Sequence, residues 1–421
     1  MRVLLTTYAD RSVLLSMVPL AWALRAAGHD VRVASTPAFT RVITDAGLLA
    51  VPVGRDDGFS RLLRPEQASA VTGLLPPYDA AVLSDDALDM ESMRSGYETA
   101  VRWWHKMANF PLISGLVDFA RYWRPDLVLW EPTTYAGSVA AAASGAVHGR
   151  VLWSIDVFGV TRARFSALCP TGGADPLGEW LAAYATRYGI EFDETLVTGM
   201  FTVDTLPESM RMTAPGLRYL PMQYVPYGGR AVVPDWLRTP PKRPRVAVTL
   251  GITAVSRFGS YNLKVQEILD SLADLDIDVV AAIAESEQRA LTRVPSNTTV
   301  VSYVPLQALA PTCSVVVHHG GPGTLLTTAR HAVPQLVLPW EFDAPELARR
   351  FARRGAGIAL DTSTMTTSDV RANVLRLLEE PSFTHGAARL RDEMLRAPTP
   401  LELVGTLEAV AAHGPRPVVR S

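Results

Sequence analysis

The residues best suited to chemistry lie in one run, Val315-Val316-Val317-His318-His319-Gly320-Gly321-Pro322-Gly323-Thr324. The run predicts a buried strand, a glycine turn and a helix over Thr324–Arg330. Glycines let the backbone approach an anion, and a helix N-terminus offers unpaired N–H groups and partial positive charge. His319 and Thr324 add side-chain donors, so the spacing predicts a phosphate or diphosphate site. Adjacent strand side chains face opposite ways, which argues against a His318–His319 metal pair.

Other phosphate-binding and cofactor motifs are missing from the sequence. A G-x-x-x-x-G-K-[ST] loop does not occur, and no G-x-G-x-x-G follows the first predicted strand. These absences argue against a P-loop nucleotidase and against dinucleotide oxidoreduction. The acidic pair Asp85-Asp86 falls in a stretch expected to be helical rather than at a strand end. We therefore expect a diphosphate to be bound without a metal, and we expect no cofactor.

Short apolar runs alternate with helical patterns through most of the chain, which predicts an α/β protein. In the first half the predicted strands are Val3–Thr7, Val31–Ala34, Leu127–Trp130 and Val151–Trp153, with helices over Ser16–Ala27 and Ala136–Ser144. In the second half they are Arg245–Leu250, Val279–Ile283, Thr299–Ser302, Ser314–His318 and Leu336–Leu338, with helices over Tyr261–Leu272, Val370–Leu378, Ala387–Leu395 and Leu401–Ala412. The pattern predicts two doubly wound, Rossmann-like domains facing across a cleft, with ligands at the carboxyl ends of the strands.

The domain boundaries follow from the places where the alternation of strands and helices is interrupted. We expect an acceptor-binding domain over 1–215, a linker over 216–244 and a donor-binding domain over 245–395. Residues 396–421 are expected to form a C-terminal helix that packs back on the first domain. Residues 57–125 are predicted to be a helical insertion rich in acidic and aromatic residues. That insertion is either a solvated face with ordinary core aromatics, or an apolar substrate pocket or partner surface.

Composition limits the classes of function. The 421 residues are 48% hydrophobic and 19% charged, which is enough apolar surface for two cores. A net charge of -2 argues against a nucleic-acid-binding protein, which would be expected to carry an excess of basic residues. The two cysteines, Cys169 and Cys313, are far apart and predict neither a disulfide framework nor a zinc site. Because no export signal or membrane-spanning run is visible, we expect a cytoplasmic protein without membrane partners.

The segment from Tyr303 to Arg349 resembles the donor-binding signature of family 1 glycosyltransferases with the GT-B fold. Nearly the whole chain resembles the actinomycete subgroup that attaches deoxysugars to macrolide and anthracycline polyketides, notably at Val18–His29, Trp123–Pro132 and Val233–Leu237. The resemblance implies inverting, metal-independent transfer of a deoxysugar from a TDP-sugar to a hydrophobic polyketide-like aglycone in antibiotic biosynthesis. Several members of the subgroup work with a P450-like auxiliary protein, so such a partner is also implied.

The resemblance assigns donor contacts residue by residue. It implies that Tyr303 and the Val304 backbone contact the nucleobase, and that Thr253 lies in a loop facing the phosphates. The diphosphate positions are His319, Gly320, Gly321, Gly323 and Thr324.

Two further donor positions bear on the choice of sugar nucleotide. Thr327 stands where plant UDP-sugar enzymes carry a ribose-binding Glu, which favours TDP. Asp343-Ala344 stands in place of an Asp–Gln pair that reads sugar hydroxyls, and loss of the Gln suits a deoxygenated sugar. Asp343 is also a natural N-cap for a helix over Ala344–Arg353, and both roles are open.

The acceptor side departs from the family at one position. The resemblance implies a basic His in the loop after the first strand, but this sequence has Val13 there. Asp10 is our first replacement for the general base, although a solvated loop residue or a helix cap would look the same. Glu131 and Asp156 are weaker replacements, and they are grouped with Val13 and Trp153 as acceptor-side residues.

The missing base leaves other readings of the function open. A phenolic or carbon nucleophile as acceptor would demand less of a base. A non-catalytic or helper-dependent pseudo-glycosyltransferase is one alternative. A nucleotide-sugar epimerase of the same fold is another, and the aromatic-rich insertion argues against it.

Overall fold

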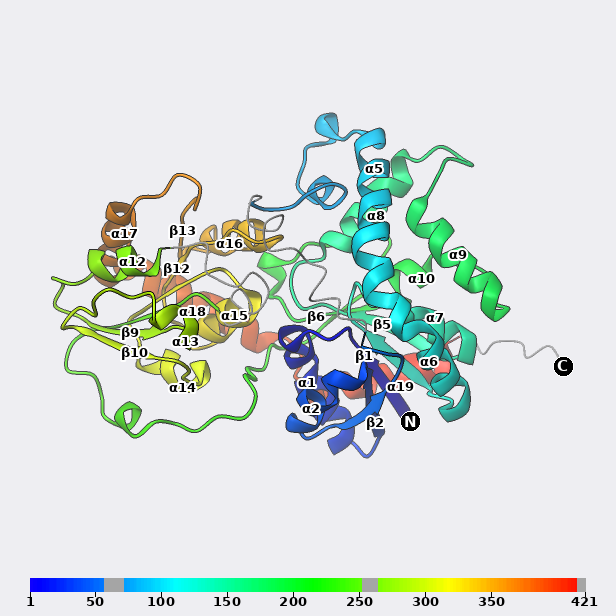
Figure 1. Cartoon of the computed structure of the whole chain (residues 1–421), viewed down its shortest axis with the longest axis horizontal. Helices are drawn as coiled ribbons and strands as arrows, with labels where there is room; N and C mark the ends of the chain where they lie inside the picture. The colour runs from blue at the N-terminus through cyan, green and yellow to red at the C-terminus, as the bar shows by residue number, and fades with distance from the viewer. Residues whose placement is uncertain (57–71, 252–263, 415–421) are drawn as a thin grey trace.

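The computed structural model describes residues 1–56, 72–251 and 264–414, which form two lobes, each built on a parallel sheet (Figure 1). The predicted α/β class with two doubly wound domains is confirmed. Most strands are buried on both faces, as expected when helices cover both sides of a parallel sheet.

The sheet of the N-terminal lobe has the strand order β3-β2-β1-β4-β5-β6-β7. Its strands are β1 (Arg2–Thr6), β2 (Asp30–Ser35), β3 (Leu49–Pro52), β4 (Leu127–Trp130), β5 (Val147–Val151), β6 (Thr202–Asp204) and β7 (Tyr219–Pro221). The order reverses between β1 and β4, which pair in parallel from Val3 opposite Leu127 to Thr6 opposite Trp130. A doubly wound sheet binds ligands beyond the carboxyl ends of the strands at such a reversal.

The sheet of the C-terminal lobe has the order β10-β9-β8-β11-β12-β13. Its strands are β8 (Arg245–Thr249), β9 (Asp278–Ala282), β10 (Thr298–Val301), β11 (Val315–His318), β12 (Gln335–Val337) and β13 (Gly357–Ala359). Here the order reverses between β8 and β11. The glycine turn after β11 therefore lies at the position where this topology places a ligand.

Helices cover both sheets. In the N-terminal lobe they are α1 (Arg11–Ala26), α2 (Thr40–Asp45), α5 (Met90–Ala100), α6 (Lys106–Trp123), α7 (Ala136–Ser144), α8 (Val157–Leu168), α9 (Pro176–Tyr188) and α10 (Thr195–Thr198). In the remainder of the chain they are α12 (Val265–Ser271), α13 (Glu285–Gln288), α14 (Leu306–Leu309), α15 (Pro322–Arg330), α16 (Ala344–Ala352), α17 (Thr367–Glu379), α18 (Pro381–Arg396) and α19 (Pro400–His413).

The segment before α5 differs from the sequence-based expectation of an acidic helix. Its described acidic residues lie in two short turns, Tyr78–Ala81 and Asp85–Ala87, and α5 begins only at Met90. The Asp89 carboxylate accepts the backbone N–H of Ser92 and caps α5. Asp favours helix starts over helix interiors because its short carboxylate competes for backbone donors, so this acidic run delays the helix.

The last helix returns to the N-terminal lobe. Leu403, Val404 and Leu407 of α19 share an apolar core with residues of α1. Nε2 of His29 lies 3.0 Å from Oε1 of Glu408 and adds a polar contact to this packing. The first helix and the last described helix therefore pack on the same lobe, as the red α19 beside the blue α1 shows in Figure 1.

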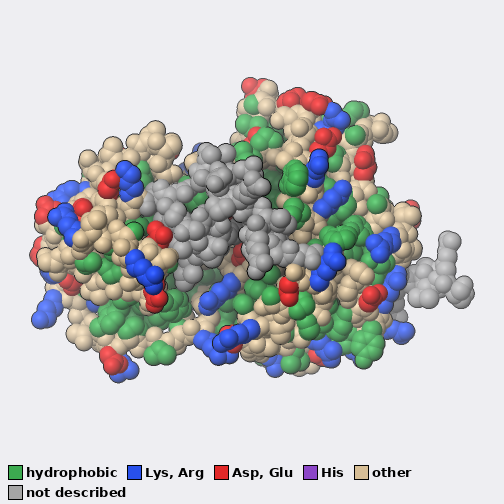
Figure 2. Space-filling model, in the orientation of Figure 1, with side chains coloured by type: hydrophobic (Ala, Val, Ile, Leu, Met, Phe, Trp, Pro, Cys, Tyr) green, Lys and Arg blue, Asp and Glu red, His purple; other side chains and the backbone are tan. Residues whose placement is uncertain are grey.

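The two lobes also share an apolar core. Ile155, Phe158 and Met210 of the first lobe pack in one cluster with Leu325 and Leu347 of the second. At the surface of the face shown in Figure 2, acidic and basic side chains are interspersed over both lobes. The apolar contact between lobes brings the ends of β5 and β12 close together.

Candidate active site

The glycine turn after β11 presents an open helix N-terminus. Gly320 has φ +87°, and a Cβ there would lie 3.3 Å from Cβ of Ala344. α15 begins at Pro322, two residues earlier than predicted, because Pro suits the first position of a helix. No side chain among the described residues caps this end. Its first N–H groups are therefore available for an anion.

His319 lies in a slot made by two glycines. A Cβ on Gly251 would lie 2.5 Å from Cε1 of the His319 ring, and one on Gly321 would lie 2.4 Å from Nε2. Nδ1 of His319 is buried with no hydrogen-bond partner among the described residues. Burial lowers the pKa of His319 to about 4, so the ring is neutral at pH 7. The Nδ1 atom of this neutral imidazole, beside the start of α15, is therefore free to contact a ligand.

His318 turns the other way, into the protein. Its Nε2 lies 2.7 Å from Oε1 of Gln335, and its Nδ1 accepts the backbone N–H of Gly320 at 3.1 Å. Because Nδ1 accepts, Nε2 carries the proton and donates to Gln335. His318 thus holds the turn in shape while His319 lines its outer side.

The expected nucleoside contacts are arranged around the linker between the lobes. Tyr303 is 40% exposed, Val304 is buried, and the Tyr303 hydroxyl lies 3.5 Å from the carbonyl of Gly228. Thr327 is buried and 2.9 Å from the hydroxyl of Tyr224, which donates to the Gly323 carbonyl at 3.1 Å. Sequence reasoning missed Tyr224, because nothing local to the linker signals its contact with α15.

Asp343 does not cap α16, so that reading of the residue is wrong. The helix has no side-chain cap, and the Asp343 side chain is buried with Oδ2 unpaired among the described residues. Burial raises the pKa of Asp343 to about 7, partly opposed by the hydroxyl of Ser154 at the end of β5. A residue of one lobe therefore faces a residue of the other at this point. Ser154 was not singled out from the sequence.

Asp10 is the N-cap of α1. Its Oδ1 accepts the Ser12 backbone N–H at 2.8 Å, the Ser12 hydroxyl at 2.6 Å and the Val13 N–H at 3.1 Å. Val13 is buried in the first turn of the same helix. The helix-cap interpretation of Asp10 therefore holds, and any role in proton transfer would be additional to it.

Glu131, directly after β4, is buried and held by its neighbours. Its carboxylate accepts the Thr133 N–H at 3.1 Å, the Thr133 and Thr134 hydroxyls, and the Trp153 indole N–H at 3.3 Å. Burial raises its pKa, and these hydrogen bonds oppose the rise. The contacts use both oxygens, so Glu131 orients Trp153 and the loop after β4.

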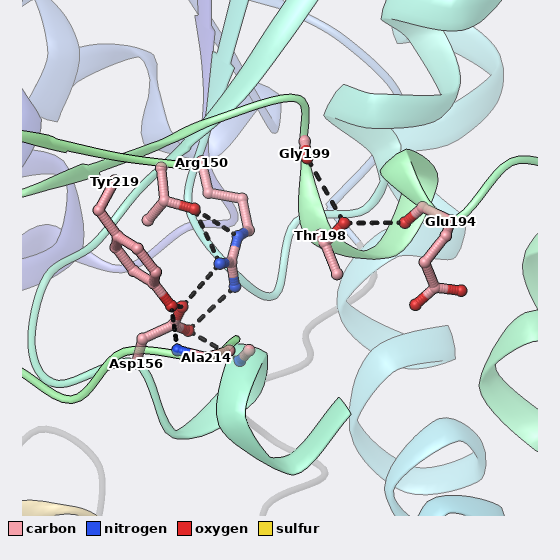
Figure 3. Close-up of polar contacts among 9 residues, drawn as sticks. Arg150, Asp156, Glu194, Thr198, Gly199, Ala214 and Tyr219 are labelled. Atoms are coloured by element: carbon pink, nitrogen blue, oxygen red, sulfur yellow. Dashed lines mark hydrogen bonds and ion pairs between the residues drawn. The ribbon is translucent and has the colours of Figure 1, made fainter. Parts of the chain in front are cut away.

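Asp156 was grouped with the acceptor side, but its contacts are structural (Figure 3). The carboxylate forms a bidentate ion pair with the Arg150 guanidinium at 2.9 and 2.6 Å, and both side chains are at most 1% exposed. It also accepts the Gly159 N–H at 2.8 Å and the Tyr219 hydroxyl at 2.7 Å. With both oxygens occupied, Asp156 ties β5, α8 and β7 together and is poorly placed to take a proton from a substrate.

Thr253 lies outside the described residues. Within the described ranges, no group of three or more His, Cys, Asp or Glu side chains is arranged to hold a metal ion. Nor is any helix in these ranges both long and apolar enough to cross a bilayer.

Comparison with known proteins gives a consistent result along the chain. Residues 22–251 match the N-terminal domain, and residues 266–410 the C-terminal domain, of erythromycin biosynthesis protein CIII-like proteins. The chain is 46% identical to 10-deoxymethynolide desosaminyltransferase of Streptomyces venezuelae over 99% of both proteins. It is 45% identical to aklavinone 7-beta-L-rhodosaminyltransferase of Streptomyces galilaeus, covering 98% of this chain and 96% of that protein.

Comparison with a solved structure leads to the same family. The glycosyltransferase VinC in complex with DTDP superposes with a TM-score of 0.87 at 38% identity, covering 98% of this chain and 100% of VinC. The likeness therefore extends over both lobes and the linker between them. This chain belongs to the erythromycin biosynthesis protein CIII-like family of GT-B glycosyltransferases.

Proposed function

We propose that this chain is a cytoplasmic enzyme that transfers a deoxysugar from a TDP-deoxysugar to a hydrophobic polyketide aglycone in antibiotic biosynthesis. Two of its relatives are a desosaminyltransferase and a rhodosaminyltransferase, and their names support the class of donor. The observation that carries the proposal is the uncapped start of α15 beside the neutral His319 ring. These groups would bind the diphosphate and stabilise its charge as it leaves.

The reaction proposed is a single displacement with inversion and without a metal. The acceptor oxygen or carbon attacks the anomeric carbon from the face opposite the diphosphate and forms the new glycosidic bond. The bond from the anomeric carbon to the diphosphate oxygen breaks, and TDP leaves with the electron pair. The proton of the acceptor passes to a base other than residue 13, because the Val13 side chain has no lone pair to accept it.

The direct test incubates the purified chain with a TDP-deoxysugar and a hydrophobic polyketide aglycone in excess EDTA. Glycosylated product and free TDP are expected at the same rate with or without EDTA, since protein donors replace a metal. Adding a P450-like auxiliary protein is expected to raise this rate. Product formed solely with the auxiliary would favour the helper-dependent reading. Absence of product in both arms would favour a non-catalytic role, and epimerised donor without acceptor would favour an epimerase.

Asp10 remains our proposed base because it lies beside Val13 at the carboxyl end of β1. We expect Asp10→Asn to lower kcat on the order of 10²–10⁴-fold, the usual contribution of a general base. Asn and Asp are comparable N-caps, so α1 and the thermal midpoint should be nearly unchanged. The measurement is kcat and melting temperature of the same preparation.

Asp10→Ser is the matched control, because Ser also caps a helix but cannot act as a carboxylate base. It should lose activity to the same extent as Asp10→Asn. If either variant kept wild-type kcat, Asp10 would be a helix cap alone.

A further inference from the structure

The first turn of α15 has few amide groups to offer an anion. Pro322 has no N–H, and the Leu325 N–H already donates to the Gly321 carbonyl at 3.0 Å. Gly323 and Thr324 therefore supply the free N–H groups of this turn, since neither donates to a described residue. The directions of these two N–H groups decide how well the turn holds a diphosphate.

A carbonyl of the same turn is held by a side chain from the linker. Tyr224 lies three residues after β7, and its hydroxyl donates to the Gly323 carbonyl at 3.1 Å. The same hydroxyl lies 2.9 Å from Oγ1 of Thr327. A phenol has one proton, so the Thr327 hydroxyl donates to the Tyr224 oxygen, and this contact strengthens the donation to Gly323. Burial raises the pKa of Tyr224 to about 12, so its proton is present at pH 7.

The geometry of the peptide bond carries this contact to the ligand side of the turn. The Gly323 carbonyl and the Thr324 N–H belong to one planar trans peptide group, in which they point in opposite directions. Fixing the carbonyl therefore fixes the direction of the N–H. Such an anchor matters here because glycine has the greatest backbone freedom of any residue. No described side chain caps this helix end and holds the peptide in another way.

Tyr224 reaches α15 from a segment that is itself tied down. The Met222 N–H donates to the Asp204 carbonyl in the N-terminal lobe at 2.9 Å. The Gln223 N–H donates to the Pro398 carbonyl, in the turn between α18 and α19, at 2.7 Å. The Tyr224 side chain also packs against the apolar core that the two lobes share. These contacts fix the position from which the Tyr224 hydroxyl holds the first turn of α15.

We propose that Tyr224 is a positioning residue for the leaving diphosphate, an inference that rests on the proposed function. Its hydroxyl holds the Gly323–Thr324 peptide so that the Thr324 N–H points toward the diphosphate. The contact is made within the protein alone, so the N–H is oriented before charge develops on the leaving group. Without the hydroxyl, this peptide gains rotational freedom, and both diphosphate binding and departure of TDP are weakened.

Tyr224→Phe tests the inference, because it keeps the ring and its packing and removes the hydroxyl alone. We expect affinity for TDP to fall about three- to tenfold, the usual worth of one hydrogen bond. The kcat with a TDP-deoxysugar should fall by a similar factor, since the same N–H stabilises the departing diphosphate. Affinity for thymidine, which has no phosphate, should be unchanged. Titration calorimetry measures TDP binding, displacement of TDP measures thymidine binding, and steady-state kinetics give kcat.

Tyr219→Phe is the matched control. The Tyr219 hydroxyl also makes two contacts, donating to Asp156 at 2.7 Å and accepting the Ala214 N–H at 2.9 Å, and neither partner belongs to α15. This variant should lower the melting temperature and leave TDP affinity and kcat per folded molecule unchanged. An equal loss of TDP affinity in both variants would assign the effect to general destabilisation and would overturn the inference.

Two further results would also contradict it. Equal losses of TDP and thymidine affinity in Tyr224→Phe would place the effect at the nucleoside rather than at the diphosphate. Wild-type TDP affinity and kcat in Tyr224→Phe would remove the positioning role and leave the proposed function standing. Failure of the wild-type protein to bind TDP would overturn the proposed function and the inference together.

Discussion

Replacing His319 with Ala is expected to lower kcat on the order of 10²–10³-fold, the usual cost of removing one preorganised donor to a developing anion. The ring is half-buried between Gly251 and Gly321, and its buried Nδ1 has no described protein partner. Burial lowers the pKa of His319 to about 4, so a neutral imidazole donates the hydrogen bond at pH 7. Affinity for TDP should fall about 10–100-fold, because a hydrogen bond to a charged group is lost.

Steady-state kinetics and titration of TDP measure the two effects. His319→Gln offers an amide N–H from a side chain of similar reach and should recover part of both. His331→Ala is the matched control, since His331 lies at the opposite end of the same helix, α15. Wild-type turnover and TDP affinity in His319→Ala would remove His319 from the site and would leave the α15 N-terminus as the sole support for a diphosphate.

Replacing Asp156 with Ala should have the largest effect on stability. The change leaves the Arg150 guanidinium buried without its counter-charge, and the Tyr219 hydroxyl and Gly159 N–H lose their acceptor. Breaking a buried ion pair from one side costs about 3–5 kcal/mol. In a lobe of this size, that corresponds to a fall in melting temperature of roughly 10 °C. Thermal melts followed by circular dichroism would measure it.

A second variant, Asp156→Asn, separates a structural Asp156 from a catalytic one. If Asp156 is structural, Asp156→Asn should retain kcat per folded molecule well below its melting temperature while its stability falls. Asp392→Ala breaks an exposed pair with Arg391 and should change the unfolding free energy by less than about 1 kcal/mol. A stable Asp156→Asn protein without turnover would instead make Asp156 the base and would displace Asp10 from that role.

The turn at His319 was predictable because every part of it is local. A buried strand, adjacent histidines on opposite faces, permissive glycines and a helix start are all consequences of residue type at short spacing. Asp10 was predictable only as a choice between a cap and a base, because a carboxylate directly before the first residue of a helix looks alike in both roles. The short strands β3, β6, β7 and β13 were not predicted. Three or four residues carry too little periodicity to separate a strand from a loop.

By itself, the sequence determined the α/β class, the two lobes and the diphosphate turn, because hydrophobic period and turn chemistry act over a few residues. Tertiary structure alone decided which carboxylates are free. Asp156 accepts a hydrogen bond from Tyr219, 63 positions along the chain, whereas Asp343 is buried with Oδ2 unpaired among the described residues. Whether a carboxylate is paired, capping or unpaired depends on groups that folding brings from distant parts of the chain. Local residue spacing cannot predict these contacts, because the partners are far apart in the sequence.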